Sequence, residues 1–184
     1  LNVVPNFDHH YQCYGEFSPA VQDYVNYKIV DWMDSKEYDK LIAEVEPYNF
    51  KEKFTMPKFI INAASDEFFV TDSWQFYWDD LPGEKHLRYV PNAGHSLEGT
   101  YQLENLASFY YRFLNNINQP NWNWKINNDT IFVNINQGQN YKIAKWEANN
   151  AKERDFRIYK IGKTWQKIDI ETNDKGHYAI PVKS

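Results

Sequence analysis

The sequence lacks a cluster of cysteines, a long apolar run and an excess of basic charge. Cys13 is the single cysteine among 184 residues, which excludes a disulfide framework and a thiolate metal cluster. No apolar run approaches the roughly 18–20 residues that a membrane helix needs, and the mean hydropathy is −0.75. A net charge of −5 provides no basic face, so neither nucleic acid nor a membrane is expected as a partner.

Aromatic residues are what the sequence has in excess. They make up 18% of the chain, with 12 Phe, 14 Tyr and 7 Trp, and each ring can bury about 150–250 Å². Hydrophobic residues at 42% and charged residues at 24% exclude a disordered chain. The first residues, Leu1 to Asn6, lack an initiator Met and the basic and apolar stretches of a signal peptide. We therefore expect a part of a longer protein, with an apolar face left exposed.

The N-terminal part of the chain predicts helices. Ser18 and Pro19 are typical of a helix start, and apolar residues continue at helical spacing to Met33. A second helix is predicted after Asp34, which would cap it in a capping box with Glu37, and its end is predicted at Pro47.

From residue 57 to residue 117 the pattern alternates between strands and helices. The continuous apolar run at residues 59–61 predicts a strand covered on both faces, and residues 87–90 predict a second one. Asp72 is expected to cap a short helix between them, and a long helix follows His95. This order predicts a parallel sheet with flanking helices, an α/β fold.

Beyond about residue 118 the composition shifts toward asparagine, and Pro120 marks the change. Apolar residues now alternate with polar ones between turn signals at Gly138, Gly162 and residues 173–176. We predict an antiparallel sheet that is part of an incomplete, β-sandwich-like accessory domain over residues 118–184, after an α/β domain over residues 1–117. The alternating residues include Ile131, Val133, Ile135, Tyr141, Ile143, Phe156, Ile158, Ile168 and Ile170.

Asp66 and His95 are the candidate catalytic residues. Each follows a predicted strand, at the sheet edge where open α/β folds hold ligands, and 95 − 66 = 29 residues separate them. The carboxylate would orient the imidazole, which would accept the proton of a nucleophile. The alternative is a turn-forming aspartate and an ordinary loop histidine. Glu67 is the second candidate for the acid, and we favour Asp66 because it comes first after the strand.

No residue of the chain fits the nucleophile of such a triad. The pattern Gly-x-Ser-x-Gly is absent, Ser18 and Ser35 lie near predicted helix starts, and Ser65 adjoins the acid. Cys13 does not lie between a strand and a helix, which favours a structural thiol. The dyad alone is not expected to turn over substrate by the triad route.

Other candidate sites have plainer explanations. His9 and His10 are adjacent and point in different directions on most backbones, so we favour a loop pair lining a pocket and predict neither a metal nor a cofactor. Residues 128–130 form a glycosylation sequon, relevant only for a secreted eukaryotic protein. Four tryptophans could form a sugar-stacking platform, although core packing is favoured. They are Trp122, Trp124, Trp146 and Trp165.

Two sequence blocks carry a family resemblance. They are MPKFIINAASDEFF at residues 56–69 and DLPGEKHLRYVPNAGH at residues 80–95, and shorter matches are WEAN at 146–149 and RDFR at 154–157. These blocks resemble the PhoPQ-activated pathogenicity-related protein family, which includes secreted eukaryotic proteins described as autocrine proliferation repressors. The resemblance covers nearly the whole chain.

The resemblance implies an α/β-hydrolase fold in which Asp66 and His95 match the acid and the base. The family's Gly-x-Ser-Lys-Arg-Gly elbow would lie before Leu1, and its members continue beyond Ser184, so a C-terminal portion is expected. The implied function is a secreted or periplasmic serine hydrolase, an esterase or peptidase for a small-molecule or peptide substrate, completed by the upstream part of its own domain. The alternative is a secreted, non-catalytic signalling or binding protein. In the enzyme, four aromatic residues would wall the substrate pocket: Phe68, Phe69, Trp74 and Tyr77.

Overall fold

The computed structural model describes residues 4–118, 121–136, 141–173 and 175–182. The chain forms two compact units: one comprises Leu1–Leu106 with Asn150–Thr164, and the other comprises Ala107–Asn149 with Trp165–Ser184. The division at about residue 118 stays a prediction, but residues 150–164, which it assigns to the C-terminal domain, pack in the first unit. The predictions for residues 1–3, Pro120, Gly138, Asp174 and the chain end fall outside the described residues.

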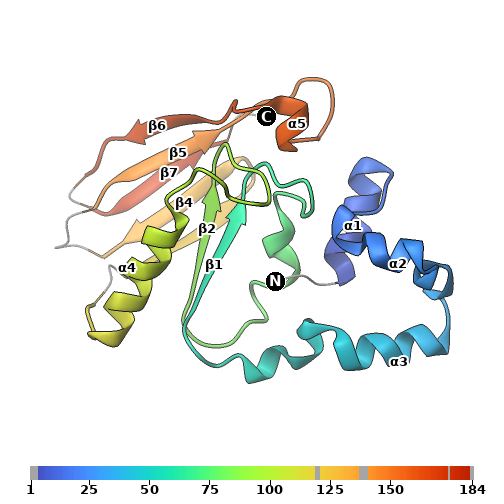
Figure 1. Ribbon diagram of the computed structural model, residues 1–184. Helices are drawn as coiled ribbons and strands as arrows, with labels where there is room; N and C mark the ends of the chain where they lie inside the picture. Colours follow the sequence, from blue (N-terminus) through green and yellow to red (C-terminus); the bar gives the residue numbers. More distant parts are fainter. Residues whose placement is uncertain (1–3, 119–120, 137–140, 174, 183–184) are drawn as a thin grey trace. The chain divides into compact units, whose positions relative to one another are not determined.

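Two parallel strands form the centre of the first unit (Figure 1). Strand β1 (Lys58–Ala63) pairs with β2 (Lys85–Val90) in a register that runs from Lys58 opposite Lys85 to Ala63 opposite Val90. The short helix η4 (Ser73–Phe76) lies in the connection between them. Both predicted strands and their parallel pairing are confirmed. The strands form here because β-branched and aromatic residues favour a covered strand.

A small aromatic core packs beside these strands. Tyr77 and Leu81 are buried, and the Tyr77 hydroxyl accepts a hydrogen bond of 3.1 Å from the Asn62 side chain on β1. A second cluster, made of Ala63, Val90 and Ala93, lies where the two strands end. The rings that pack on the first cluster are Tyr48, Phe54, Trp74 and Phe76.

The N-terminal helices differ from their prediction. Ser18 caps as expected, accepting a hydrogen bond of 3.2 Å from the Ala20 N–H, but the predicted continuous helix is wrong. It is broken into η1 (Pro19–Val21), α2 (Gln22–Asn26) and η2 (Ile29–Trp32). Lys28 interrupts it with φ = 58°, and the β-branched residues around it are weak helix formers.

The following helix, α3 (Lys36–Val45), is confirmed, but its cap is Ser35 rather than Asp34. The Ser35 hydroxyl accepts a hydrogen bond of 3.1 Å from the Tyr38 N–H. Pro47 then starts η3 (Pro47–Lys53) instead of merely ending α3. A helix that the sequence analysis missed, α1 (Val4–Tyr14), precedes all of these.

The second unit contains antiparallel sheets. Strands β3 (Trp122–Asn127), β4 (Thr130–Ile135) and β7 (His177–Pro181) form one sheet in the order β3-β4-β7. Strands β5 (Ile143–Glu147) and β6 (Gln166–Ile170) form the other. The antiparallel prediction is confirmed and the sandwich stays a prediction. The expected strand at Ile158 is wrong, because α5 (Ile158–Ile161) stands there.

The chain exposes many apolar side chains, as expected. On α4 (Gln102–Leu114), Leu103 is 80% exposed and Tyr110 60%. Trp122 and Trp146 are about two-fifths exposed, at 42% and 41%, so they do not fill a core. Among the helices of the described residues, none combines the length and apolar character needed to cross a membrane.

Gly176 sits where the turn before β7 approaches β4 closely. Its φ is +67°, and a Cβ added to Gly176 would overlap the carbonyl oxygen of Ile135. The backbone N–H of Ile135 in turn donates a hydrogen bond of 2.8 Å to the Gly176 carbonyl oxygen. We expect Gly176→Ala to cost about 2–4 kcal/mol in free energy of unfolding, measured by urea denaturation. Gly99→Ala is the control, since Gly99 has φ = +70° and open space, and should cost only about 1 kcal/mol. Equal losses would contradict the overlap.

Candidate functional site

The loops that follow β1 and β2 are joined by backbone hydrogen bonds beyond the last strand pair. Ala64 N–H donates to Val90 O at 2.9 Å, and Ser65 N–H donates to Ala93 O at 3.1 Å. Both loops lie at the same end of the two parallel strands (Figure 1). Because the chain ends of parallel strands meet at one sheet edge, this pairing brings Asp66 next to His95 across 29 residues.

Asp66 and His95 form a hydrogen-bonded pair. His95 Nδ1 lies 3.1 Å from Asp66 Oδ2 and 3.2 Å from Oδ1. A carboxylate only accepts, so Nδ1 carries the proton and Nε2 is the basic nitrogen. No described residue hydrogen-bonds Nε2, and the His95 side chain is 39% exposed. The geometry therefore holds Nδ1 against the carboxylate and leaves Nε2, on a partly exposed side chain, without a hydrogen bond from a described residue.

The Asp66 carboxylate is buried and held from its own loop. Its residue is 6% exposed, and Oδ1 accepts hydrogen bonds from the Phe68 N–H at 2.7 Å and the Phe69 N–H at 3.1 Å. Burial raises the pKa of Asp66 above its ordinary value, and the bonds from Phe68, His95 and Phe69 offset only part of that rise. The fold therefore tolerates an unfavourable charge at this position.

The raised pKa predicts that Asp66→Asn stabilises the folded chain. A folded-state pKa above the unfolded value means that ionised Asp66 weakens the fold, and that this penalty disappears as the pH falls through the folded pKa. The amide still accepts from both backbone N–H groups. We expect a gain of about 0.5–2 kcal/mol at pH 7, measured by urea denaturation and shrinking toward acid pH. A loss of stability at pH 7 would contradict this account.

Two of the four predicted pocket residues contact the dyad. The Phe68 ring stacks on the His95 ring at 4.3 Å between centroids, and the Phe69 ring meets its edge at 5.2 Å. Trp74 and Tyr77 lie instead in the aromatic core, where Tyr77 is 1% exposed. Phe68 and Phe69 therefore limit the movement of the imidazole.

Glu67, the alternative acid, does not contact the imidazole ring. Its Oε2 accepts a hydrogen bond of 3.0 Å from the His95 backbone N–H. Gly94 permits this approach, because a Cβ there would lie 2.7 Å from Glu67 Oε2 and 3.1 Å from Ile158 Cγ2. Glu67 therefore positions the His95 backbone, while Asp66 contacts the ring.

The carbonyl groups of the Asp66 loop are held by residues that the sequence analysis did not assign to the site. Ser18 Oγ donates to Phe68 O at 2.7 Å. Fully buried His10 places Nε2 3.4 Å from Glu67 O and Nδ1 3.0 Å from Glu16 O. His10 thus lies on α1 rather than in a loop, and the helical spacing of Phe7, Tyr11 and Tyr14 is the signal that indicates α1.

A buried ion pair supports the same loop. Arg157 donates from Nε to both oxygens of Asp155 at 3.0 Å, and it also pairs with Glu16. The next residue, Ile158, donates its N–H to Ser65 O at 2.9 Å, directly before Asp66. The family resemblance marks Asp155 and Arg157 as part of a motif, but the sequence contains no sign that they lie next to a residue bonded to the Asp66 loop.

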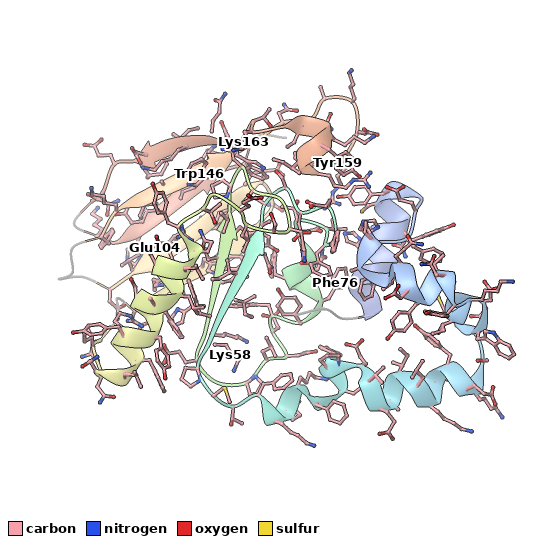
Figure 2. All side chains as sticks on the ribbon, in the orientation of Figure 1. Lys58, Phe76, Glu104, Trp146, Tyr159 and Lys163 are labelled. Atoms are coloured by element: carbon pink, nitrogen blue, oxygen red, sulfur yellow. The ribbon has the colours of Figure 1, made fainter. Side chains whose placement is uncertain are left out.

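A separate polar cluster joins α1 to the η4 connection. His9 Nε2 lies 3.1 Å from Asp72 Oδ1, Arg154 also pairs with Asp72, and Arg154 donates to Cys13 Sγ at 3.2 Å. Asp72 makes these bonds in place of the predicted helix cap. Phe76 of η4, labelled in Figure 2, places its ring 5.2 Å from the His9 ring. Among the described residues, no group of three or more His, Cys, Asp or Glu could hold a metal ion.

Comparison with known proteins agrees with the motifs around the dyad. The sequence profile of the PhoPQ-activated pathogenicity-related protein family matches residues 1–157. The chain belongs to this family, which confirms the resemblance carried by the blocks that contain Asp66 and His95. No solved structure matches the chain.

The chain is similar to autocrine proliferation repressor protein A of Dictyostelium discoideum. The two are 35% identical over 205 residues, an alignment that covers 99% of this chain and 41% of the relative. The chain therefore spans about two-fifths of the length of this relative.

Proposed function

We propose that the protein is a serine hydrolase of the α/β-hydrolase fold, in which His95 is the general base and Asp66 its orienting acid. The observation that carries this proposal is the difference between the two ring nitrogens of the His95 imidazole. Nδ1 is hydrogen-bonded to a buried carboxylate, while Nε2 has no hydrogen-bond partner among the described residues and the side chain is 39% exposed. A Ser-His-Asp triad requires this arrangement.

The nucleophile is a serine supplied by a part of the protein outside these 184 residues. Within the described residues, no serine or cysteine hydrogen-bonds the His95 ring. Nε2 of His95 takes the proton of the serine as its oxygen attacks a carbonyl carbon. Asp66 stabilises the resulting imidazolium, which then protonates the leaving alcohol or amine. Water repeats the sequence on the acyl-enzyme and releases the acid.

The substrate class of this proposal is an ester or a peptide. Phe68 and Phe69 flank the imidazole and provide an apolar wall for the group attached to the reacting carbonyl. The test is to treat the complete protein with a fluorophosphonate probe and to locate the adduct by peptide mass spectrometry. We expect one labelled serine, and absence of any adduct on a folded protein would count against hydrolysis.

A second function is supported by the relative's name. The similarity to autocrine proliferation repressor protein A extends over 99% of this chain, and we propose as an alternative a secreted signalling protein that keeps a hydrolase scaffold without turnover. We also propose, from the family resemblance, that the protein is secreted or periplasmic.

The two functions are separated by a cell assay. The variant Asp66→Asn/His95→Ala is added to proliferating cells at the concentration at which the wild-type protein slows growth. Full activity of the variant supports signalling without catalysis, whereas loss of activity in a folded variant supports catalysis as the basis of the effect.

A further inference from the structure

A cavity of about 210 Å³ lies among the N-terminal helices of the first unit. Neither Asp66 nor His95 lines it. Its volume is below the roughly 300–1,000 Å³ of sites for drug-sized ligands, so it suits a ligand of one ring with a short chain. Most of its walls are apolar side chains, which include Phe7, Phe17, Val21, Val30, Met33 and Ile42.

The charged groups that line the cavity are of one sign. Asp8 and Glu46 contribute carboxylates, and none of the described lining residues is Lys, Arg or His. Glu46 is 9% exposed, and its Oε1 accepts a hydrogen bond of 3.1 Å from the Tyr48 N–H. The cavity therefore combines apolar walls with negative charge.

The Asp8 and Glu46 carboxylates both lie close enough to Tyr38 to affect the pKa of its hydroxyl group. Its pKa is raised, first by burial and then by the nearby groups of Asp8, Tyr24 and Glu46. Tyr24 and Tyr38 both line the cavity, and phenol faces attract cations as carboxylates do. An anion is repelled from such a site, whereas a cation is attracted by the two carboxylates, most strongly by the buried Glu46.

We propose that this cavity binds a small aromatic ammonium ligand, a single ring that carries a primary amine on a short alkyl chain. The ring occupies the space between the apolar side chains, and the ammonium group lies on the side lined by Asp8 and Glu46. This site rests on the cavity alone and does not depend on the proposed hydrolysis.

The test compares two ligands of nearly equal shape on the intact protein. Calorimetric titration with 2-phenylethylammonium should give at least about tenfold tighter binding than 2-phenylethanol, which lacks the charge. Equal affinity for the two ligands, or no binding of the ammonium ligand, would overturn the proposal.

Substitution of each cavity carboxylate tests whether the ammonium ligand binds in this cavity. Glu46→Gln and Asp8→Asn should each weaken binding of the ammonium ligand about tenfold and leave 2-phenylethanol unchanged, which also shows that the cavity is intact. Gln retains an acceptor for the Tyr48 N–H. Glu44→Gln is the matched control, since Glu44 is exposed on α3 outside the lining and should change neither affinity. An unchanged preference for the ammonium ligand in both cavity variants would overturn the assignment.

Discussion

His95→Ala in the complete protein is expected to abolish labelling by a fluorophosphonate, with a fall in the labelling rate of at least about 10³-fold. The reason is that the proposed serine loses its general base, while the nearby rings of Phe68 and Phe69 persist. The His95 side chain is about two-fifths exposed. Among the described residues, Asp66 is the one side chain to which the His95 ring is hydrogen-bonded. The folded state should therefore change little, which circular dichroism can check.

His86→Ala is the matched control for this prediction. His86 is also a histidine of the parallel-strand region, on β2, and its Nε2 contacts the Glu84 carboxylate at 2.7 Å instead of Asp66. Its labelling rate should stay within about twofold of the wild type. Unchanged labelling of a folded His95→Ala variant would remove His95 from the mechanism.

Arg157→Met is expected to cost about 3–5 kcal/mol in free energy of unfolding at pH 7, measured by urea denaturation. Asp155 and Arg157 are 3% and 5% exposed, so the variant leaves a buried carboxylate without its guanidinium. It also removes the cation above the Tyr14 ring, 4.0 Å from its centroid, and the pairing with Glu16. Arg154→Met, the control, breaks a more exposed pair with Asp72 and should cost at most about 1 kcal/mol.

The loss should depend on pH in a defined direction. Burial raises the pKa of Asp155, but the hydrogen bonds and charge of Arg157 outweigh burial and hold that pKa below its ordinary value. The pair therefore stabilises the wild type above the unfolded pKa, and this stability is lost as the pH falls through the folded pKa. The difference between wild type and Arg157→Met should shrink on acidification. A difference that grows at low pH would contradict the ion-pair explanation.

The dyad could be predicted from the sequence because its determinants are local. Each residue follows an apolar strand by a few positions, and parallel strands bring their chain ends to one edge. The helix from Ser18 could not be predicted as observed, since its helical apolar pattern contains no sign that Lys28 adopts φ = 58° and interrupts the helix.

The buried ion pair that adjoins the Asp66 loop could not be predicted either. Arg157 lies 91 residues after Asp66 (157 − 66), in a stretch whose alternation of Phe156 and Ile158 indicates a strand. The hydrogen bond from Ile158 to Ser65 and the buried Asp155 carboxylate determine its conformation instead. Such long-range contacts leave no periodicity in the sequence.

The coupling between Asp66 and His95 is the most direct test of the account. Fluorophosphonate labelling rates are measured for the complete protein as wild type, Asp66→Asn, His95→Ala and the double variant. We predict a loss of about 10²–10⁴-fold for Asp66→Asn and a double variant no slower than His95→Ala, because the carboxylate acts only through the imidazole. Losses that multiply in the double variant, or a folded Asp66→Asn protein that labels at the wild-type rate, would contradict a catalytic dyad.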